Sequence, residues 1–99
     1  MTFVTTQPEI MTTAAGQLTG LGTELNAQNA TAMVPASGVI PAAADEVSAL
    51  TAAQFASHAA LYQAVSAHAA AVHELFVSAL GASAGSYAAT EAANASSAL

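Results

Sequence analysis

The sequence predicts an all-α fold, an antiparallel hairpin of two long helices at about residues 8–34 and 45–80. Three observations lead to this prediction: a seven-residue apolar repeat early in the chain, one cluster of helix-breaking residues in the middle, and a long Ala-rich apolar stretch after it. The composition then changes to Ala, Ser and Gly. We therefore expect one helical domain at residues 1–80, followed by a flexible tail at residues 81–99.

The first helix is predicted to begin at Pro8, because a proline at the first helical position loses no hydrogen bond. Glu9 follows, and its carboxylate interacts favourably with the positive end of the helix. Met11, Leu18 and Leu25 then recur every seven residues. This spacing is typical of a helix packed lengthwise on another helix.

The first helix contains three glycines, Gly16, Gly20 and Gly22, and one polar residue, Gln28, at a position of the apolar pattern. Each glycine weakens a helix by up to about 1 kcal/mol relative to alanine, so this helix is expected to depend on packing. Gln28 lies on the packed stripe, where it either fixes the register of the two helices or is simply exposed.

The turn is predicted between Pro35 and Pro41, the only strong breaker cluster in the middle of the chain. A second helix should begin near Asp45 or Glu46, whose acidic side chains suit a helix N-terminus. It should end at about residue 80, because Gly81 is a natural C-terminal stop. The short link makes the two helices antiparallel neighbours.

The second helix carries two apolar stripes, and the single internal face of a two-helix hairpin covers only one of them. The first stripe contains Val47, Leu50, Leu61, Val65, Val72 and Leu75, and the second contains Phe55, Tyr62, Ala69, Phe76 and Leu80. A long uncovered apolar stripe predicts an interface with another protein. The alternative is a wide apolar face wrapped around the Ala-rich first helix.

Composition excludes several classes of function. The chain has 99 residues, no Lys or Arg, six acids and no Cys. Without cations it cannot neutralise phosphates, which argues against binding to nucleic acids or to anionic membranes. The N-terminus lacks the features of a signal peptide. Polar residues interrupt the Ala-rich stretch at 49–82 too often for a membrane span, so no span is predicted.

No catalytic residue, metal ligand or cofactor site is predicted. Residues 81–85 read Gly-Ala-Ser-Ala-Gly and match the hydrolase nucleophile motif. That motif needs a strand before Ser83 and a His after it, and neither is expected here. The three histidines are spaced ten and five residues apart, not the three or four that place two ligands on one helix face. They are His58, His68 and His73.

At this level of detail the chain resembles the PE proteins of mycobacteria. The resemblance spans essentially all 99 residues and rests on the opening Met1-Thr2-Phe3-Val4, the pair Pro8-Glu9 for which the family is named, Ala43-Ala44-Asp45-Glu46-Val47-Ser48-Ala49, Phe55, His58, Tyr62-Gln63 and Ala88-Ala89-Thr90-Glu91-Ala92-Ala93-Asn94. Longer members carry Gly-rich or other extensions, so the sequence resembles a stand-alone PE domain.

The resemblance implies a function that periodicity does not provide. PE proteins pair one-to-one with a PPE protein, and the two hairpins together form a four-helix bundle. The pair assembles in the cytosol, where a chaperone grips the PPE subunit, and leaves through a type VII (ESX) secretion system to be secreted or surface-located. The family's C-terminal secretion signal, Y-x-x-x-D/E, matches Tyr87 and Glu91.

The expected interface with the PPE partner combines apolar residues of both helices. These are Leu18, Leu21, Leu25, Phe55, Tyr62, Val65, Val72, Phe76 and Leu80. An alternative hypothesis is a self-associating protein of the cell envelope, a homodimer that forms a four-helix bundle from two copies of this chain. An enzymatic hypothesis rests on Ser83 alone.

Overall fold

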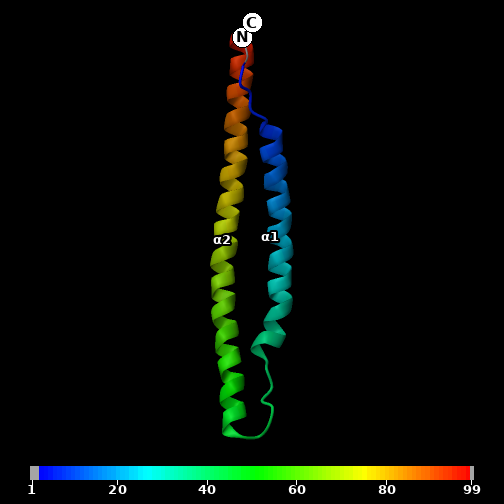
Figure 1. Cartoon of the computed structure of the whole chain (residues 1–99), viewed down its shortest axis with the longest axis vertical. Coiled ribbons are helices and arrows are strands. Elements are labelled where there is room, and N and C mark those ends of the chain that lie inside the picture. The colour runs from blue at the N-terminus through cyan, green and yellow to red at the C-terminus, as the bar shows by residue number, and fades with distance from the viewer. Residues whose placement is uncertain (1–2, 99) are drawn as a thin grey trace. The chain divides into compact units, whose positions relative to one another are not determined.

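The computed structural model describes residues 3–98 and contains two helices, α1 (Pro8–Ser37) and α2 (Glu46–Ser97). The helices pack as a hairpin, and no strand occurs among the described residues (Figure 1). The predicted all-α hairpin is therefore confirmed. Its contacts group into two compact units, with residues 3–22 and 73–98 in unit 1 and residues 23–72 in unit 2. In each unit a segment of α1 lies along a segment of α2.

Helix α1 begins at Pro8 as predicted and ends slightly later than expected, at Ser37 rather than near residue 34. Pro35 lies inside its last turn. Beyond the proline, local donors satisfy two of the last carbonyls of the helix. The Ser37 hydroxyl donates to the Met33 carbonyl at 2.7 Å, and the Gly38 amide donates to the Val34 carbonyl at 3.0 Å.

Helix α2 begins at Glu46, as the acidic pair predicted, and Asp45 is its N-cap. Oδ1 of Asp45 accepts a hydrogen bond from the Ser48 amide at 2.8 Å, and Oδ2 accepts one from the Ser48 hydroxyl at 2.8 Å. These bonds satisfy a backbone donor that the helix leaves without a partner. The hydrogen bond from the Ser48 amide is the main reason that the pKa of Asp45 lies below its ordinary value.

The expected end of the second helix near residue 80 is wrong, because α2 continues through Gly81 and Gly85 to Ser97. A glycine ends a helix by adopting a positive φ, and no glycine among the described residues does so. The segment is rich in alanine, the strongest helix former. Ala84 is also 3% exposed, so packing in unit 1 stabilises this part of α2. A functional division into residues 1–80 and 81–99 stays a prediction.

The core is unusually small. Four residues are buried among those that the structure describes, and all four are alanines: Ala15, Ala52, Ala59 and Ala84. Half-buried residues of α2 join them at steps of three and four as far as Ala84, and Glu91 follows two turns later, which is the pattern of one helix face packed lengthwise on a neighbour. We call this face the seam; its half-buried members are Ser48, Ala56, Gln63, Ser66, Ala70, His73, Val77, Leu80 and Glu91.

The cap of α2 predicts a pH dependence. The pKa of Asp45 in the folded chain lies below 3.8, so the stability that its charge contributes is present above about pH 3.8 and is lost as the pH falls through the lower folded value. Asp45→Asn keeps a capping oxygen and cannot ionise. Thermal unfolding followed by circular dichroism should give wild type a higher melting temperature than Asp45→Asn near neutral pH. The difference between the two melting temperatures should shrink in acid. A gap that is constant down to pH 2 would contradict this role.

Candidate interaction surface

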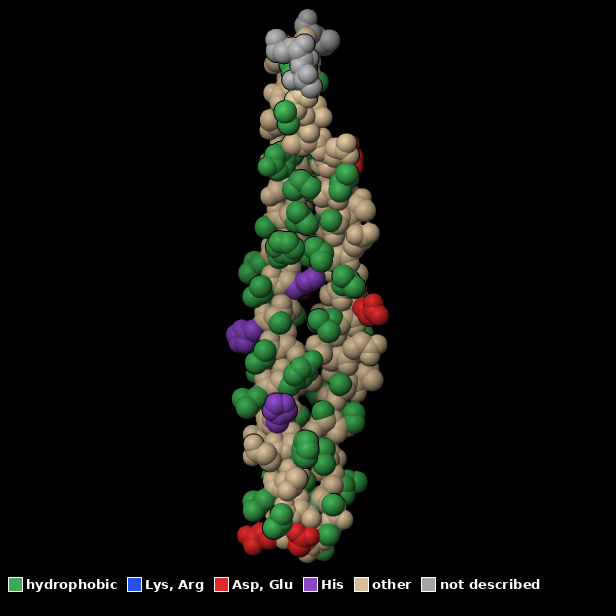
Figure 2. Space-filling model, viewed as in Figure 1, with side chains coloured by type: hydrophobic (Ala, Val, Ile, Leu, Met, Phe, Trp, Pro, Cys, Tyr) green, Lys and Arg blue, Asp and Glu red, His purple; other side chains and the backbone are tan. Residues whose placement is uncertain are grey.

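The large apolar side chains lie outside the core. Seven of the nine predicted interface residues are exposed, from 49% for Tyr62 to 66% for Val65 and Val72. In unit 2 these are Leu25, Phe55, Tyr62, Val65 and Val72, and in unit 1 they are Leu21 and Phe76. Figure 2 shows hydrophobic side chains along both helices on the face in view. The role of these residues in an interface stays a prediction.

Leu18 and Leu80 differ from the other seven because both are half-buried in unit 1. Leu80 is a member of the seam. The backbone carbonyl of Leu18 contacts another member of the seam, His73. These two residues therefore contribute to packing within the hairpin, and only part of each side chain remains for a partner.

Small residues in the seam explain why the large ones are exposed. Alanine and serine let two helices approach closely and bury little apolar area per residue. The large side chains of unit 2 then fall outside the contact at helical spacing. They include residues that the sequence did not assign to the interface: Val47, Leu50 and Leu61, each at least 64% exposed. The apolar surface of unit 2 is thus wider than the predicted stripe.

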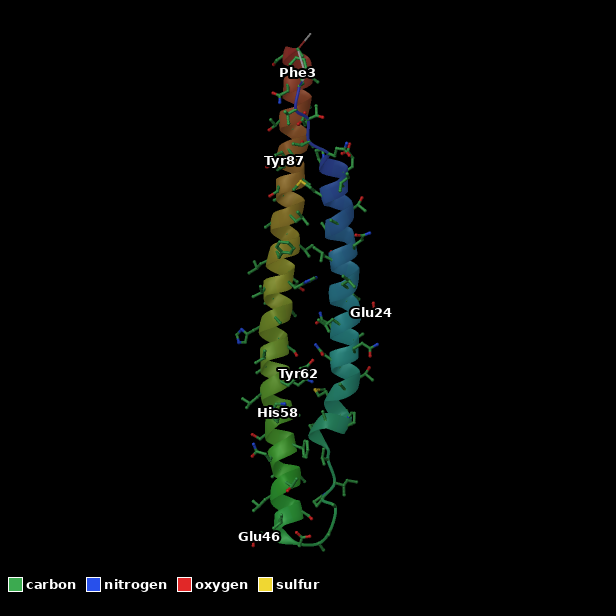
Figure 3. The ribbon with its side chains drawn as sticks, viewed as in Figure 1. Phe3, Glu24, Glu46, His58, Tyr62 and Tyr87 are labelled. Atoms are coloured by element: carbon green, nitrogen blue, oxygen red, sulfur yellow. The ribbon has the colours of Figure 1, made fainter. Side chains whose placement is uncertain are left out.

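A polar clamp sets the register of the helices in unit 2. The Tyr62 hydroxyl donates to Oδ1 of Asn29 at 2.9 Å, and Nε2 of Gln63 donates to the Asn29 carbonyl at 3.4 Å. Figure 3 shows Tyr62 on α2, on the side that faces α1. Gln28, the candidate register residue, is exposed. Its neighbour Asn29 forms the contacts between the helices instead.

A second polar contact fastens unit 1. Nε2 of His73 lies 2.6 Å from the Leu18 carbonyl oxygen. Gly22 makes room for the ring, because a Cβ at this position would lie 2.9 Å from Cδ2 and Nε2 of His73. The glycine that weakens α1 by its propensity thus leaves the space that the His73 ring occupies. His73 serves as a packing residue, and among residues 3–98 no three acids or histidines gather into a possible metal site.

The two residues of the predicted signal lie one turn apart on α2, in unit 1. Tyr87 is 47% exposed, whereas Glu91 is half-buried. Oε1 of Glu91 accepts hydrogen bonds from the Thr6 amide at 2.8 Å and from the Thr6 hydroxyl at 2.9 Å. Sequence spacing does not predict this contact, because the two residues are 85 positions apart.

A groove of about 640 Å³ lies beside this contact in unit 1. It brings the Pro8-Glu9 pair close to the signal segment, two motifs from opposite ends of the sequence. The lining residues are Thr6, Pro8, Glu9, Thr12, Thr13, Ala84, Gly85, Ala88 and Glu91.

The hydrolase motif does not have the geometry that its chemistry requires. Ser83 lies inside α2, far from either end of that helix. A nucleophile elbow needs a sharp turn between a strand and a helix, and the described part of the chain contains no strand. The match is therefore a consequence of an Ala-, Ser- and Gly-rich composition.

Helix α2 is long and apolar enough to cross a membrane, judged by length and composition alone. An 18-residue stretch of α2 has a mean hydropathy of 1.2, and no residue of this stretch is buried inside the structure. A helix that is exposed in the free chain and covered by a partner protein in a complex has the same length and apolar composition. The absence of a membrane span stays a prediction.

Known proteins resemble this chain over almost its whole length. The sequence model of the PE family matches residues 4–94 of this chain. The chain is 58% identical over 98 residues to the PE family protein PE13 of Mycobacterium tuberculosis (strain ATCC 25618 / H37Rv), and the match covers 99% of both chains.

Two longer relatives from the same species match as well. The chain is 51% identical over 98 residues to the PE family protein PE8 of strain ATCC 25618 / H37Rv, covering 99% of this chain and 36% of the relative. It is 56% identical over 95 residues to the PE-PGRS family protein PE_PGRS33 of strain CDC 1551 / Oshkosh, covering 96% and 20%. In these relatives the matched region is a minor part of the protein.

The contact between Gly22 and His73 predicts opposite effects for two glycine substitutions in α1. Gly22→Ala forces the His73 ring away from the Leu18 carbonyl and should lower the melting temperature. Gly16→Ala is the matched control, because its Cβ meets nothing within 4 Å. It should stabilise the helix by up to about 1 kcal/mol.

Placing Gly22→Ala in a His73→Ala background tests the cause. The substitution should no longer destabilise the protein, since the ring is gone. Equal destabilisation by Gly22→Ala with and without His73 would contradict the packing explanation. Differential scanning fluorimetry on all four proteins is sufficient to measure the effect.

Proposed function

The chain belongs to the PE family, and we propose that it is the non-enzymatic subunit of a heterodimer with a PPE-family protein, exported by a type VII (ESX) secretion system. Its hairpin contributes two helices of a four-helix bundle, and the PPE protein contributes the others. Membership of the family supports a role in protein interaction. The finer assignment rests on the surface and the signal segment.

The observation that carries the proposal is the amount of surface that the chain leaves uncovered. A folded monomer of 9.6 kDa exposes roughly 5,100 Å², whereas this chain exposes 7462 Å². The excess, roughly 2,400 Å² on one chain, is at least the share that each partner loses in an obligate protein–protein interface of about 2,000–5,000 Å² in total. A core of four alanines supplies little hydrophobic stabilisation. A partner that covers the large apolar side chains would supply the rest.

Charge supports a partner held by apolar packing. The chain carries six acids and no Lys or Arg, so it cannot form Lys–Glu pairs of its own along a helix. The exposed aromatic residues Phe55, Tyr62 and Phe76 are the residue types that dominate protein interfaces. They are the proposed anchors on the PPE subunit.

Tyr87 and Glu91 are the proposed secretion signal. They match the family's Y-x-x-x-D/E pattern and lie on the last part of α2, where Tyr87 is accessible. The proposed route begins with assembly in the cytosol, where a chaperone holds the PPE subunit, and ends outside the cell or at its surface.

Self-association is the second candidate function. The same exposed side chains would be covered if two copies of this chain packed as a homodimeric four-helix bundle at the cell envelope. The uncovered surface favours both candidates equally, and the family membership favours the PPE partner.

Phe55→Asp is expected to abolish pairing with the PPE protein, because it would bury an unpaired charge in an apolar interface. Ile40→Asp is the matched control: Ile40 is 85% exposed in the loop between the helices and lies outside the proposed interface. Co-purification of each variant with a tagged PPE partner measures the effect. Wild-type yield of the Phe55→Asp complex would remove this residue from the interface.

Tyr87→Ala is expected to block export while the complex with the PPE protein forms normally. Ser86→Ala, one residue earlier on the same helix, should export like wild type. The amount of protein in culture filtrate relative to cell lysate measures export, and co-purification measures pairing. Normal secretion of Tyr87→Ala would show that this tyrosine is no part of the signal.

A further inference from the structure

Glu91 has two hydrogen bonds that the proposed signal does not explain. Oε1 accepts one from the Thr6 amide at 2.8 Å and one from the Thr6 hydroxyl at 2.9 Å. Hydrogen bonds to a carboxylate are about twice as strong as bonds between neutral groups. Glu91 thereby ties the segment before α1 to the last part of α2.

The position of Thr6 gives this contact its consequence. Thr6 lies two residues before Pro8, where α1 begins, and has no helix of its own to hold it. The groove of about 640 Å³ beside it is lined from both sides of the contact. Losing the Glu91 carboxylate would free the N-terminal segment and open one wall of the groove.

The two signal residues also differ in exposure. Tyr87 is accessible, whereas Glu91 is half-buried and its Oε1 atom is engaged with Thr6. An export receptor that reads this face can contact Tyr87 directly. The Glu91 carboxylate holds Thr6, and with it the segment before α1, instead of facing solvent.

We propose that Glu91 is a positioning residue, which fastens the segment before α1 to α2 one turn after Tyr87 and so holds an ordered Thr6 against the part of α2 that carries Tyr87. This inference rests on the proposed function of Tyr87 as part of an export signal. The signal is then complete only in a folded hairpin. An unfolded chain has the same Tyr-x-x-x-Glu spacing, but it lacks the contact across 85 residues.

The rival explanation is a direct contact between the Glu91 charge and the receptor. Substitutions at Thr6 distinguish the two explanations, because Thr6 lies outside the Tyr-x-x-x-Glu pattern. If Glu91 positions the segment, removal of the Thr6 donors should impair export. If Glu91 binds the receptor, Thr6 variants should export normally and Glu91→Gln, which loses the charge but keeps an acceptor oxygen, should fail.

The experiment compares export of four variants in complex with the PPE protein. Thr6→Val removes the hydroxyl donor, and Thr6→Pro also removes the amide donor. Glu91→Ala removes the acceptor, and Glu91→Gln retains one. Thr5→Val is the matched control, because Thr5 precedes the contact. Circular dichroism and co-purification select variants that still fold and pair.

The proposal predicts export in the order wild type, Thr6→Val, then Thr6→Pro and Glu91→Ala. The last two should lie about tenfold below wild type, the factor expected for loss of a charge-assisted hydrogen bond. Glu91→Gln should recover most of the export that Glu91→Ala loses. Wild-type export of Thr6→Pro together with failure of Glu91→Gln would overturn the proposal.

Hydrogen exchange at the Thr6 amide tests the fastening without any export assay. Exchange should be about tenfold faster in Glu91→Ala than in wild type. Unchanged exchange would overturn the proposal, whatever Tyr87→Ala does. Faster exchange, combined with normal export of Tyr87→Ala, would keep the fastening and discard only the signal assigned to Tyr87.

Discussion

The use of mostly small side chains where the two helices pack is the constraint on which the rest of this structure depends. Alanines form the buried core, and an alanine interface allows near contact of the backbones but buries little area. Folding of the chain alone therefore gains less from the hydrophobic effect than its apolar composition suggests. The large side chains are left outside, where they become available to another protein.

Because the alanine-rich core has few large side chains that could define a register, polar contacts define the register of the two helices. The Tyr62 hydroxyl reaches Asn29 in unit 2, and His73 reaches the Leu18 carbonyl in unit 1, through space that Gly22 leaves open. Each of these contacts is directional and would be lost if one helix slid by a turn. Each unit held in this way presents its own exposed residues in a fixed register, which binding to a specific partner requires.

Periodicity and helix-end chemistry predicted much of the fold: both helix starts, the antiparallel hairpin and the excess of apolar surface. Gly81 misled the prediction, because a glycine ends a helix only when it adopts a positive φ, and surrounding alanines with Ala84 in the core keep it helical. The bond between Glu91 and Thr6 could not be found from spacing, since it depends on where the ends of the hairpin meet. The sequence predicted that one apolar stripe would be left uncovered by the hairpin. Which residues of α2 belong to the seam and which are exposed could be read only from the structure.

We propose that this chain requires a PPE protein to cover its apolar surface. Light scattering coupled to size-exclusion chromatography, with the chain expressed alone and then with candidate PPE partners, tests it directly. We expect the chain to aggregate or to be unstable when expressed alone and to form a soluble 1:1 complex with one partner. A stable homodimer that ignores every candidate would contradict the claim and favour self-assembly.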